Sequence, residues 1–521
     1  MSAHAASIGP QEQVWQPSVN PWLIAIAVMS ATFMEVLDTS VANVSLPHIA
    51  GTLSASTDEA TWVLTSYLVS NAIILPATGW LSSFFGRKRL LISCIIIFTI
   101  ASALCGAATS LGWLILARVM QGIGGGVLQP TAQAVLMESF PVEKRGQAMA
   151  VYGMGVVVAP IIGPTLGGWI TDNYSWRWIF YINIPVGILA VLMAQAFIED
   201  PPYLRRTGRR TIDYIGFGLM TLALGALQIM LDKGQQEDWF ESRLIITLTV
   251  VAVLALLAFV LWELQTEEPI VNLRVLKNRN FAIGTILMTM LGAALYSTVA
   301  LLPLFLQTLM GYPSVQSGLA VSPRGLGSLV SMILVGRLIG SLDSRWLMGS
   351  GFAMLALSVF WLGNINLDIS MTSVIWPNIL SGFSMGFIFI PLSTTALSLL
   401  PREQLGSATG IFSLMRNLGG GIGISAATTL LTRLAQTNQA NLIAHLTPYD
   451  AAFRERFEQL RSLLGEQRAY AAIYGTLVRQ ANLLAFVSSF RILAVLCLLC
   501  LPLVFLFRKT RAKSGTDTAM H

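Results

Sequence analysis

The chain has 521 residues, of which 54% are hydrophobic and only 11% are charged. This composition excludes a soluble globular protein, in which about a quarter of the residues are charged, and it is typical of a chain that crosses a membrane many times. The net charge of +6 requires no nucleic-acid partner, since basic loops beside anionic lipid account for it. The cysteines lie in apolar stretches and the histidines are sparse, so no metal site is predicted.

Fourteen stretches are long and apolar enough to cross a bilayer as helices. The predicted fold class is therefore an all-α polytopic membrane protein with 14 transmembrane helices. In chain order, the predicted spans lie near residues 22–46, 61–82, 90–109, 112–136, 146–170, 176–198, 212–231, 243–263, 281–307, 315–340, 346–364, 372–398, 405–432 and 482–507.

Lysine and arginine collect in alternate short loops, whereas the other loops carry mostly acids. Because basic loops stay in the cytoplasm, both termini are predicted to be cytoplasmic, with 1–21 a polar tail rather than a signal peptide and 508–521 a basic tail. The basic positions are Arg87, Lys88, Arg89, Lys144, Arg145, Arg205, Arg206, Arg209, Arg210, Arg274, Lys277, Arg279, Arg345, Arg402, Arg508, Lys509 and Arg511.

The sequence also repeats with an offset of 260 residues. Because an even number of spans separates the copies, they form a parallel repeat, which predicts two six-helix bundles at 22–200 and 275–507, with a linker and an inserted two-helix hairpin at 201–274. A central cavity opened to each side in turn is the expected mechanism. The matched pairs are Gly122 with Gly382, Gly126 with Gly386, Pro141 with Pro401, Glu143 with Glu403, Gly146 with Gly406, Ala148 with Ala408 and Gly163 with Gly423.

Two carboxylates, Glu35 and Asp38, lie on one face of the first predicted span. A charge at bilayer depth costs from about 2.5 kcal/mol upward, so such acids usually mark a proton or substrate path. Arg118 lies well inside the fourth span and needs an anion, for which these acids are the candidates. Desolvation and mutual repulsion favour the protonated acids, whereas the arginine favours the charged form. Proton coupling by these three residues is the hypothesis; a purely structural pair, or an arginine that tethers backbone carbonyls, is the alternative.

Small residues recur at every fourth position of the fifth span, at Gly155, Ala159, Gly163 and Gly167, followed by Gly168. Such a stripe lets another helix approach closely, and packing alone would explain it. Pro160 and Pro164 add a bend.

Other polar, charged and aromatic residues in the spans are candidates for the wall of a substrate cavity. Arg324 and Arg416 would contact an anionic substrate there, or else snorkel or cap helix ends, and many of the others would be ordinary helix packing. The candidates are Asn43, Asn71, Gln121, Gln129, Tyr296, Gln307, Arg324, Asn378, Phe387 and Arg416.

A polar external loop is predicted at 433–481, between the last two spans. Within it, Thr447 reads as an N-cap, Pro448 as the first residue of a helix and Asp450 as its third. Such an amphipathic helix would lie on the membrane, dock a partner or merely cover the bundle. Its apolar face would consist of Phe453, Phe457, Leu460 and Leu464.

Several motifs resemble those of the major facilitator superfamily, and in particular its fourteen-span drug:proton antiporters of the EmrB/QacA type. Gly79 and Leu81 followed by Gly86, Arg87 and Lys88 resemble the cytoplasmic loop motif, although Ser83 and Phe84 stand where that motif usually has aspartate and arginine; Asp343 is the candidate equivalent in the second half. The remaining matches are Arg118-x-x-Gln121-Gly122, Gly163-Pro164-x-x-Gly167-Gly168, Leu37-Asp38-Thr39 through Asn43 to Pro47, Trp176 to Pro185, and Leu227 to Asp232 leading to Asp238-Trp239-Phe240.

The resemblance implies a proton-coupled antiporter of the bacterial inner membrane that exports amphipathic drugs, powered by the proton gradient without a cofactor. It ties the bend at Pro160 and Pro164 to antiport, and it implies a periplasmic adaptor and an outer-membrane channel, with loop 433–481 as the candidate contact. A dedicated exporter of a fatty acid or siderophore is the alternative, and a non-transporting sensor is a further one. An enzyme is not expected, because the glycine-rich run 122–126 lies inside a membrane helix and no nucleophile or phosphate-binding constellation is recognisable.

Overall fold

The computed structural model describes residues 17–201 and 213–508. Within these ranges the chain is helical and has no strand, which confirms the predicted fold class. The main helices are α1 (Pro21–Val44), α2 (Leu46–Thr52), α3 (Thr57–Ala60), α4 (Trp62–Ile74), α5 (Thr78–Phe85), α6 (Arg87–Gly106), α7 (Leu111–Ser139), α8 (Arg145–Asn173), α9 (Trp178–Tyr181), α10 (Asn183–Phe197), α11 (Tyr214–Lys233), α12 (Arg243–Gln265), α13 (Arg279–Thr308), α14 (Ser314–Val321), α15 (Pro323–Leu338), α16 (Ser344–Leu362), α17 (Met371–Ser398), α18 (Leu405–Ile443), α19 (Ala451–Leu464) and α20 (Glu466–Val504).

Thirteen segments of the described chain are helices long and apolar enough to cross a membrane. They match the predicted spans except the one near 405–432, which forms the first part of the long, more polar α18. The predicted cytoplasmic tail 1–21 lies largely outside the described residues, and so do the basic linker at 205–210 and the tail after residue 508.

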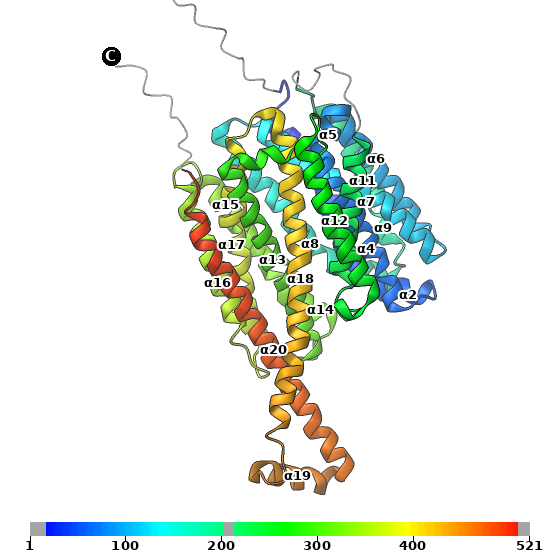
Figure 1. Cartoon of the computed structure of the whole chain (residues 1–521), viewed down its shortest axis with the longest axis vertical. Helices are drawn as coiled ribbons and strands as arrows, with labels where there is room; N and C mark the ends of the chain where they lie inside the picture. Colours follow the sequence, from blue (N-terminus) through cyan, green and yellow to red (C-terminus); the bar gives the residue numbers. More distant parts are fainter. Residues whose placement is uncertain (1–16, 202–212, 509–521) are drawn as a thin grey trace, which may run out of the picture.

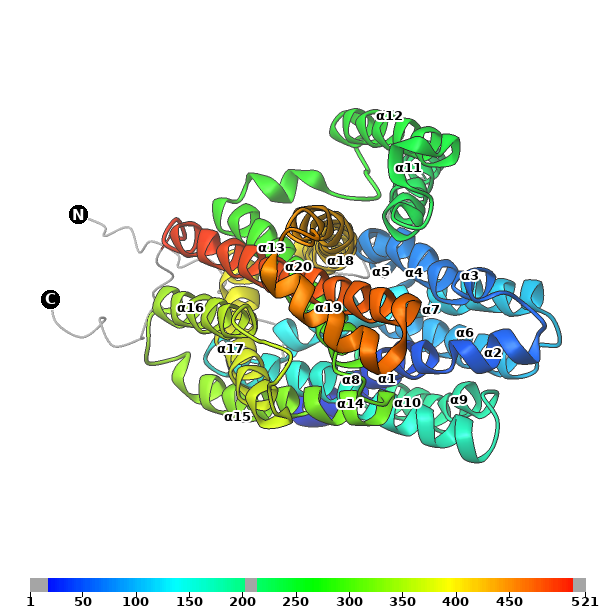
Figure 2. The same ribbon diagram turned by 90° about the horizontal axis from the view of Figure 1, so that it is seen from below.

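Two helical bundles stand side by side, with the hairpin of α11 and α12 at their flank (Figure 1, Figure 2). The first bundle consists of α1 and α4 to α10, and the second consists of α13 to α18 with α20. Local sequence sets the helix ends. Asn20 accepts a hydrogen bond from the amide of Trp22 at the start of α1, where Pro21 needs no hydrogen-bond partner for its nitrogen.

Three predicted spans are divided into shorter helices. Pro76 lies in a 3-10 turn between α4 and α5, and Pro323 begins α15 directly after α14 ends. The third break, at Ile182, separates α9 from α10. A proline has no N–H to donate within a helix, which accounts for the first two breaks, although Pro160 and Pro164 lie inside the unbroken α8.

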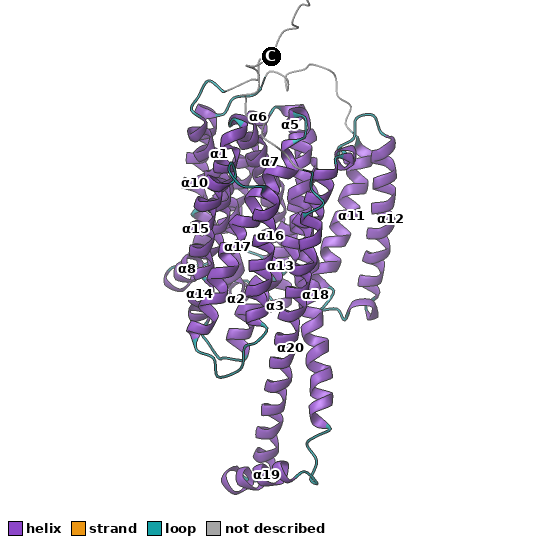
Figure 3. Cartoon of the chain, turned by 90° about the vertical axis from the view of Figure 1, so that its left-hand side faces the viewer, coloured by secondary structure: helices purple, strands orange, loops and turns teal. Residues whose placement is uncertain are grey.

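The loop predicted at 433–481 is mostly helix. α18 continues to Ile443 and α20 begins at Glu466, so each has 39 residues and a length of about 58 Å, and both project together beyond the bundles (Figure 1, Figure 3). α19 lies across the tip. Its N-cap is Asp450, which accepts hydrogen bonds from the amides of Ala452 and Phe453, so the predicted cap at Thr447 is wrong. The acidic cap one turn later wins because a carboxylate also complements the helix dipole.

The two bundles pack closely at the end of the molecule where Arg87 and Arg145 begin α6 and α8, called the basic end here. A Cβ added at Gly79 would collide with the backbone of Ser407, and one added at Gly410 would lie 2.7 Å from the carbonyl oxygen of Leu75. These glycines therefore let α18 approach α5 and the 3-10 turn before it closely. Toward the other end of α8, Pro160, Ile162 and Thr165 are exposed. The structure thus presents a conformation that is closed at the basic end.

We expect a disulfide bond to join the two bundles when Ala150→Cys on α8 and Gly336→Cys on α15 are combined. A Cβ added at Gly336 would lie 3.1 Å from that of Ala150, which is close enough for a disulfide after a small adjustment. If the purified protein is cleaved between the two bundles, oxidation should keep the two fragments joined, and they should run together as one larger band on a non-reducing denaturing gel. Val330→Cys with Ala150→Cys is the control pair, because Val330 is 59% exposed on α15. Equal cross-linking of both pairs would contradict the closed basic end.

Candidate functional site

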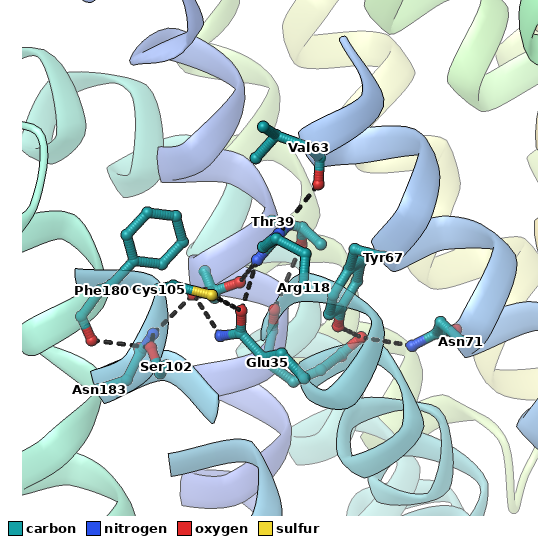
Figure 4. A network of polar contacts seen from close by, with 12 residues as sticks. Glu35, Thr39, Val63, Tyr67, Asn71, Ser102, Cys105, Arg118, Phe180 and Asn183 are labelled. Carbon is teal, nitrogen blue, oxygen red and sulfur yellow. Dashed lines mark hydrogen bonds and ion pairs between the residues drawn. The ribbon is translucent and has the colours of Figure 1, made fainter. Parts of the chain in front are cut away.

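A buried ion pair connects α1 and α7 (Figure 4). Nη1 of Arg118 donates to Oδ2 of Asp38 across 2.6 Å, and both side chains are 0% exposed. Nε of Arg118 donates to the carbonyl oxygen of Val63 across 3.1 Å, and its guanidinium lies 4.3 Å from the centre of the Tyr67 ring. The arginine is thus held by a charge, a carbonyl and an aromatic face, each of which compensates part of its lost hydration.

The other oxygen of Asp38 is also hydrogen-bonded. Nε2 of Gln121 donates to Oδ1 across 2.9 Å, and Nδ2 of Asn183 donates to it across 2.7 Å. Asn183 is itself positioned by Ser102 on α6, across 2.9 Å. Side chains from α7 and α10 therefore meet at this carboxylate of α1, and α6 is connected to it only through Ser102 and Asn183. A change in the charge of Asp38 acts directly on three helices.

Glu35 lies one turn before Asp38 on α1 but contacts a different set of residues. Its carboxylate accepts hydrogen bonds from Tyr67 across 3.0 Å, from Asn71 across 3.5 Å and from Gln129 across 2.6 Å. Arg118 pairs with Asp38 and makes no ion pair with Glu35. The two acids are therefore separate proton-binding candidates rather than one shared site.

Gln129 connects Glu35 to the second bundle. Its amide nitrogen donates to Glu35, and its amide oxygen accepts a hydrogen bond from Nη2 of Arg416 on α18. Arg416 is buried, and its Nε has no hydrogen-bond partner among the described residues. A negative and a positive group thus face each other across the interface with one neutral amide between them.

The glycine and proline segment of α8 packs against α1 beside the ion pair. A Cβ on Gly163 would collide with Ser40, one on Gly167 would lie 2.8 Å from the side chain of Val41, and one on Gly155 would collide with Met29. The carbonyl oxygen of Pro160, on the same segment, accepts a 3.4 Å hydrogen bond from Ser40. Pro164 lies between these contacts, whereas Gly168 faces open space. The stripe therefore brings α8 against α1 within a few residues of Asp38.

The cytoplasmic-loop motif lies at the basic end and is held by two acids that the sequence analysis did not single out. Gly86 has a φ of +81°, a conformation that favours glycine, and the next residue, Arg87, forms a buried ion pair with Glu138 of α7. The amide of Lys88 donates to Asp200 across 2.8 Å. Gly79 contacts Ser407 of the other bundle. Asp343, the proposed equivalent in the second half, caps α16 through the amide of Arg345.

The structure divides the cavity candidates into three groups. Asn71, Gln121, Gln129 and Arg416 join the contacts of the two acids. Arg324 and Asn378 are buried in the second bundle. Nη2 of Arg324 donates a hydrogen bond to Ser381 across 2.6 Å, and Asn378 donates one to a carbonyl oxygen of its own helix. The rest lie elsewhere: Asn43 and Gln307 are exposed, Tyr296 is half-buried beside Gly420, and Phe387 packs against Gly351 of α16.

Sequence reasoning missed Tyr67, Ser102 and Asn183 as site residues. Asn183 carried a signal, because it belongs to the motif from Trp176 to Pro185. Tyr67 and Ser102 carried none, since an aromatic residue or a hydroxyl in a membrane helix usually only packs. Within the described ranges, no group of three metal-binding side chains converges.

Two helical bundles side by side, with a buried ion pair between α1 and α7 of the first bundle, form the architecture of a membrane transporter. The model of the Major Facilitator Superfamily matches residues 28–424, and the chain belongs to this family.

Among similar proteins, Multidrug export protein EmrB of Escherichia coli (strain K12) is 38% identical over 501 residues, covering 96% of this chain and 98% of that protein. Fatty acid resistance protein FarB of Neisseria gonorrhoeae is 39% identical over 485 residues, covering 93% and 95% respectively. A solved structure of a double-tryptophan XylE mutant has a TM-score of 0.61 at 14% identity, covering 95% of this chain and 97% of that one. The human organic anion transporter MFSD10 has a TM-score of 0.60 at 13% identity, covering 93% and 100%. These two structures support the fold.

The ion pair generates a stability prediction. Arg118→Met leaves the Asp38 carboxylate buried without its counter-charge, and breaking a buried pair in this way costs about 3–5 kcal/mol. We expect a clearly lower midpoint of thermal unfolding in detergent, followed by tryptophan fluorescence. Adding Asp38→Asn should recover part of the loss, because a neutral amide no longer needs a cation. Additive losses in the double variant would show that the two side chains do not stabilise each other.

Proposed function

We propose that this protein is a proton-coupled antiporter that exports amphipathic, mainly hydrophobic compounds by alternating access. The observation that carries the proposal is the buried pair of Asp38 and Arg118, placed where α8 contacts α1. A fully buried ion pair is energetically costly within a membrane, so such pairs usually occur where a change in protonation has a function. The similarity to EmrB over nearly the whole chain supports export of several drugs as the function.

Protonation of Asp38 is the coupling step in this proposal. A proton removes the negative charge that Arg118, Gln121 and Asn183 surround, so the contacts between α1, α7 and α10 weaken together. α1 then shifts against α8 at Ser40, and the balance between the inward-facing and outward-facing states changes. A proton that binds from the outer side would thereby favour release of the exported compound on that side.

Glu35 would act as the second proton-sensitive group and would reach the other bundle. Through Gln129 it faces Arg416, so loss of its negative charge weakens a polar link that holds the bundles together. A cationic compound in the cavity would compete for the same carboxylate. Through this link, the protonation state of Glu35 would directly affect the second bundle.

The basic end is proposed to face the cytoplasm of a Gram-negative bacterium, with both termini on that side of the inner membrane. The loops there carry the lysines and arginines. The projecting ends of α18 and α20, with α19, would then lie in the periplasm and contact an adaptor protein that leads to an outer-membrane channel. Tyr449 and Leu463 support this, because they are 91% and 79% exposed at the tip.

Part of the predicted apolar face of α19 is already used within the chain. The rings of Phe453 and Phe457 stack with centroids 5.9 Å apart, and Phe457 lies 4.5 Å from Tyr470 of α20. These contacts fix α19 on α20 and leave the more exposed Leu463 for a partner. Different residues of α19 would therefore pack against α20 and contact an adaptor.

A dedicated exporter of fatty acids is the second candidate function. FarB, named for fatty acid resistance, is as similar to this chain as EmrB is. Arg324 supports an acidic substrate: it is buried, and its Nε lacks a hydrogen-bond partner among the described residues. A panel of ethidium, Nile red and oleate in proteoliposomes separates the two, since transport of oleate alone would favour the dedicated exporter.

Asp38→Asn is expected to abolish transport of the panel compounds that is driven by a pH gradient. The amide keeps hydrogen-bonding atoms at this position but cannot exchange a proton. Initial rates in proteoliposomes should fall to the level of empty liposomes, while binding of the compounds in detergent persists. Asp38→Glu is the matched control and should keep part of the rate. Wild-type transport by Asp38→Asn against a gradient would remove Asp38 from the coupling role.

Leu463→Glu on α19 is expected to weaken capture of the periplasmic adaptor about tenfold or more, because it places a charge in the centre of the proposed contact. Ser462→Glu is the matched control, since it adds the same charge to the neighbouring position. Pull-down of the adaptor by the purified full-length protein measures the effect, and transport in proteoliposomes should stay normal for both. Equal capture by wild type and Leu463→Glu would sink the docking proposal.

A further inference from the structure

A groove of about 460 Å³ lies on the side of the molecule where α8 meets the junction of α14 and α15. Five of its lining residues come from α8 and one comes from the second bundle, so the groove belongs to the seam between the bundles. The lining residues are Ile161, Ile162, Thr165, Leu166, Trp169 and Ser322.

The wall of the groove is apolar except for the hydroxyls of Thr165 and Ser322 and the indole N–H of Trp169. Ser322 donates to the carbonyl oxygen of Leu319 across 3.1 Å. Thr165 makes no hydrogen bond with the described part of the chain, although Thr285, Thr298 and Thr394 each donate to the carbonyl four residues earlier. A hydroxyl without a partner at bilayer depth is costly. The groove therefore offers a few polar contacts, among them the Thr165 hydroxyl, within an apolar surface, which suits an amphipathic molecule.

The groove adjoins the contact between α8 and α1 near Asp38. On α8, Ile161 and Thr165 line the groove, while Gly163 between them packs against Ser40 of α1. Ile161 also fills the space that a Cβ at Gly325 of α15 would need. A shift of α8 that moves Ile161 and Thr165 relative to Ser322 would thus change the shape of the groove.

The opposite seam is covered by the inserted hairpin (Figure 2). Asp232 of α11 accepts a hydrogen bond from Thr65 of α4 in the first bundle. Just after α11, Nε1 of Trp239 donates to Thr429 of α18 in the second bundle, across 2.9 Å. Since the hairpin bridges α4 and α18, lateral access through that seam is obstructed, and the seam at α8 is left as the lateral route.

From these observations we infer that the groove is a lateral portal that binds the apolar part of the exported compound when the basic end is closed. The inference rests on the proposed export function. The exported amphipath is the occupant because the groove joins both bundles, carries an unpaired hydroxyl and adjoins the contact at Ser40. A passive lipid slot would require none of these features.

Two substitutions of groove residues test the portal in full-length protein. Thr165→Phe fills the groove and is expected to lower the initial rate of Nile red transport about fivefold or more. Val330→Phe is the matched control, because Val330 lies on the exposed face of α15 outside the groove, and it should keep the wild-type rate. Thr165→Val, which removes only the hydroxyl, should give a smaller loss.

Protection of a thiol tests binding independently of transport. The cysteines at 94, 105, 497 and 500 are buried, so Ser322→Cys provides a reactive reporter in the groove. Nile red, added at constant lipid content, is expected to slow alkylation of this cysteine by N-ethylmaleimide at least about threefold, as a bound ligand excludes reagent.

The outcomes separate the portal from the proposed function. Normal transport by Thr165→Phe together with unprotected Ser322→Cys would overturn the portal. Absence of Nile red transport by the wild-type protein would count against the export proposal, and the protection assay alone would then decide whether the groove binds such compounds.

Discussion

The ion pair between Asp38 and Arg118 constrains the rest of the first bundle. Removing two charges from water costs several kcal/mol for each ion, so the pair persists only if good geometry and further hydrogen bonds compensate. Gln121, Asn183, the carbonyl of Val63 and the ring of Tyr67 supply that compensation from helices on all sides. The packing of α1 against α4, α7 and α10 is thereby linked to the carboxylate of Asp38. Protonation of this carboxylate would weaken several contacts between helices at once.

The second bundle contributes the opposite charge. Within the described part of the chain, Arg416 has no acidic partner at hydrogen-bonding distance and meets Glu35 through Gln129. The polar link between the bundles therefore depends on a residue from each. The closed basic end adds a purely steric contact, at Gly79 with Ser407 and at Gly410 with Leu75. Rocking of the bundles must break both kinds of contact. Charge and packing therefore act at different depths of the same interface.

Much of this architecture follows from sequence, because membrane spans need long apolar helices and buried charges are rare. Arg118 and the two acids stand out for that reason. The division of labour between the acids does not follow, since Glu35 and Asp38 share a helix face and only the surrounding helices decide that one meets Arg118 and the other Gln129. Likewise, the predicted loop at 433–481 contains the ends of the two long helices α18 and α20. Their residues there lack the apolar content by which membrane spans are recognised. Asp450 replaced Thr447 as the cap because its carboxylate accepts the amides of Ala452 and Phe453 and also complements the helix dipole, which residue spacing alone does not reveal.

Coupling of a proton to an exported compound is the central claim, and proton movement tests it most directly. Wild-type protein can be reconstituted in liposomes that contain the pH-sensitive dye pyranine, with the membrane potential clamped and no initial pH gradient. Imposing a gradient of an amphipathic dye that the protein carries should then drive protons in the direction opposite to the dye. Movement of the dye without any change in internal pH would contradict the account.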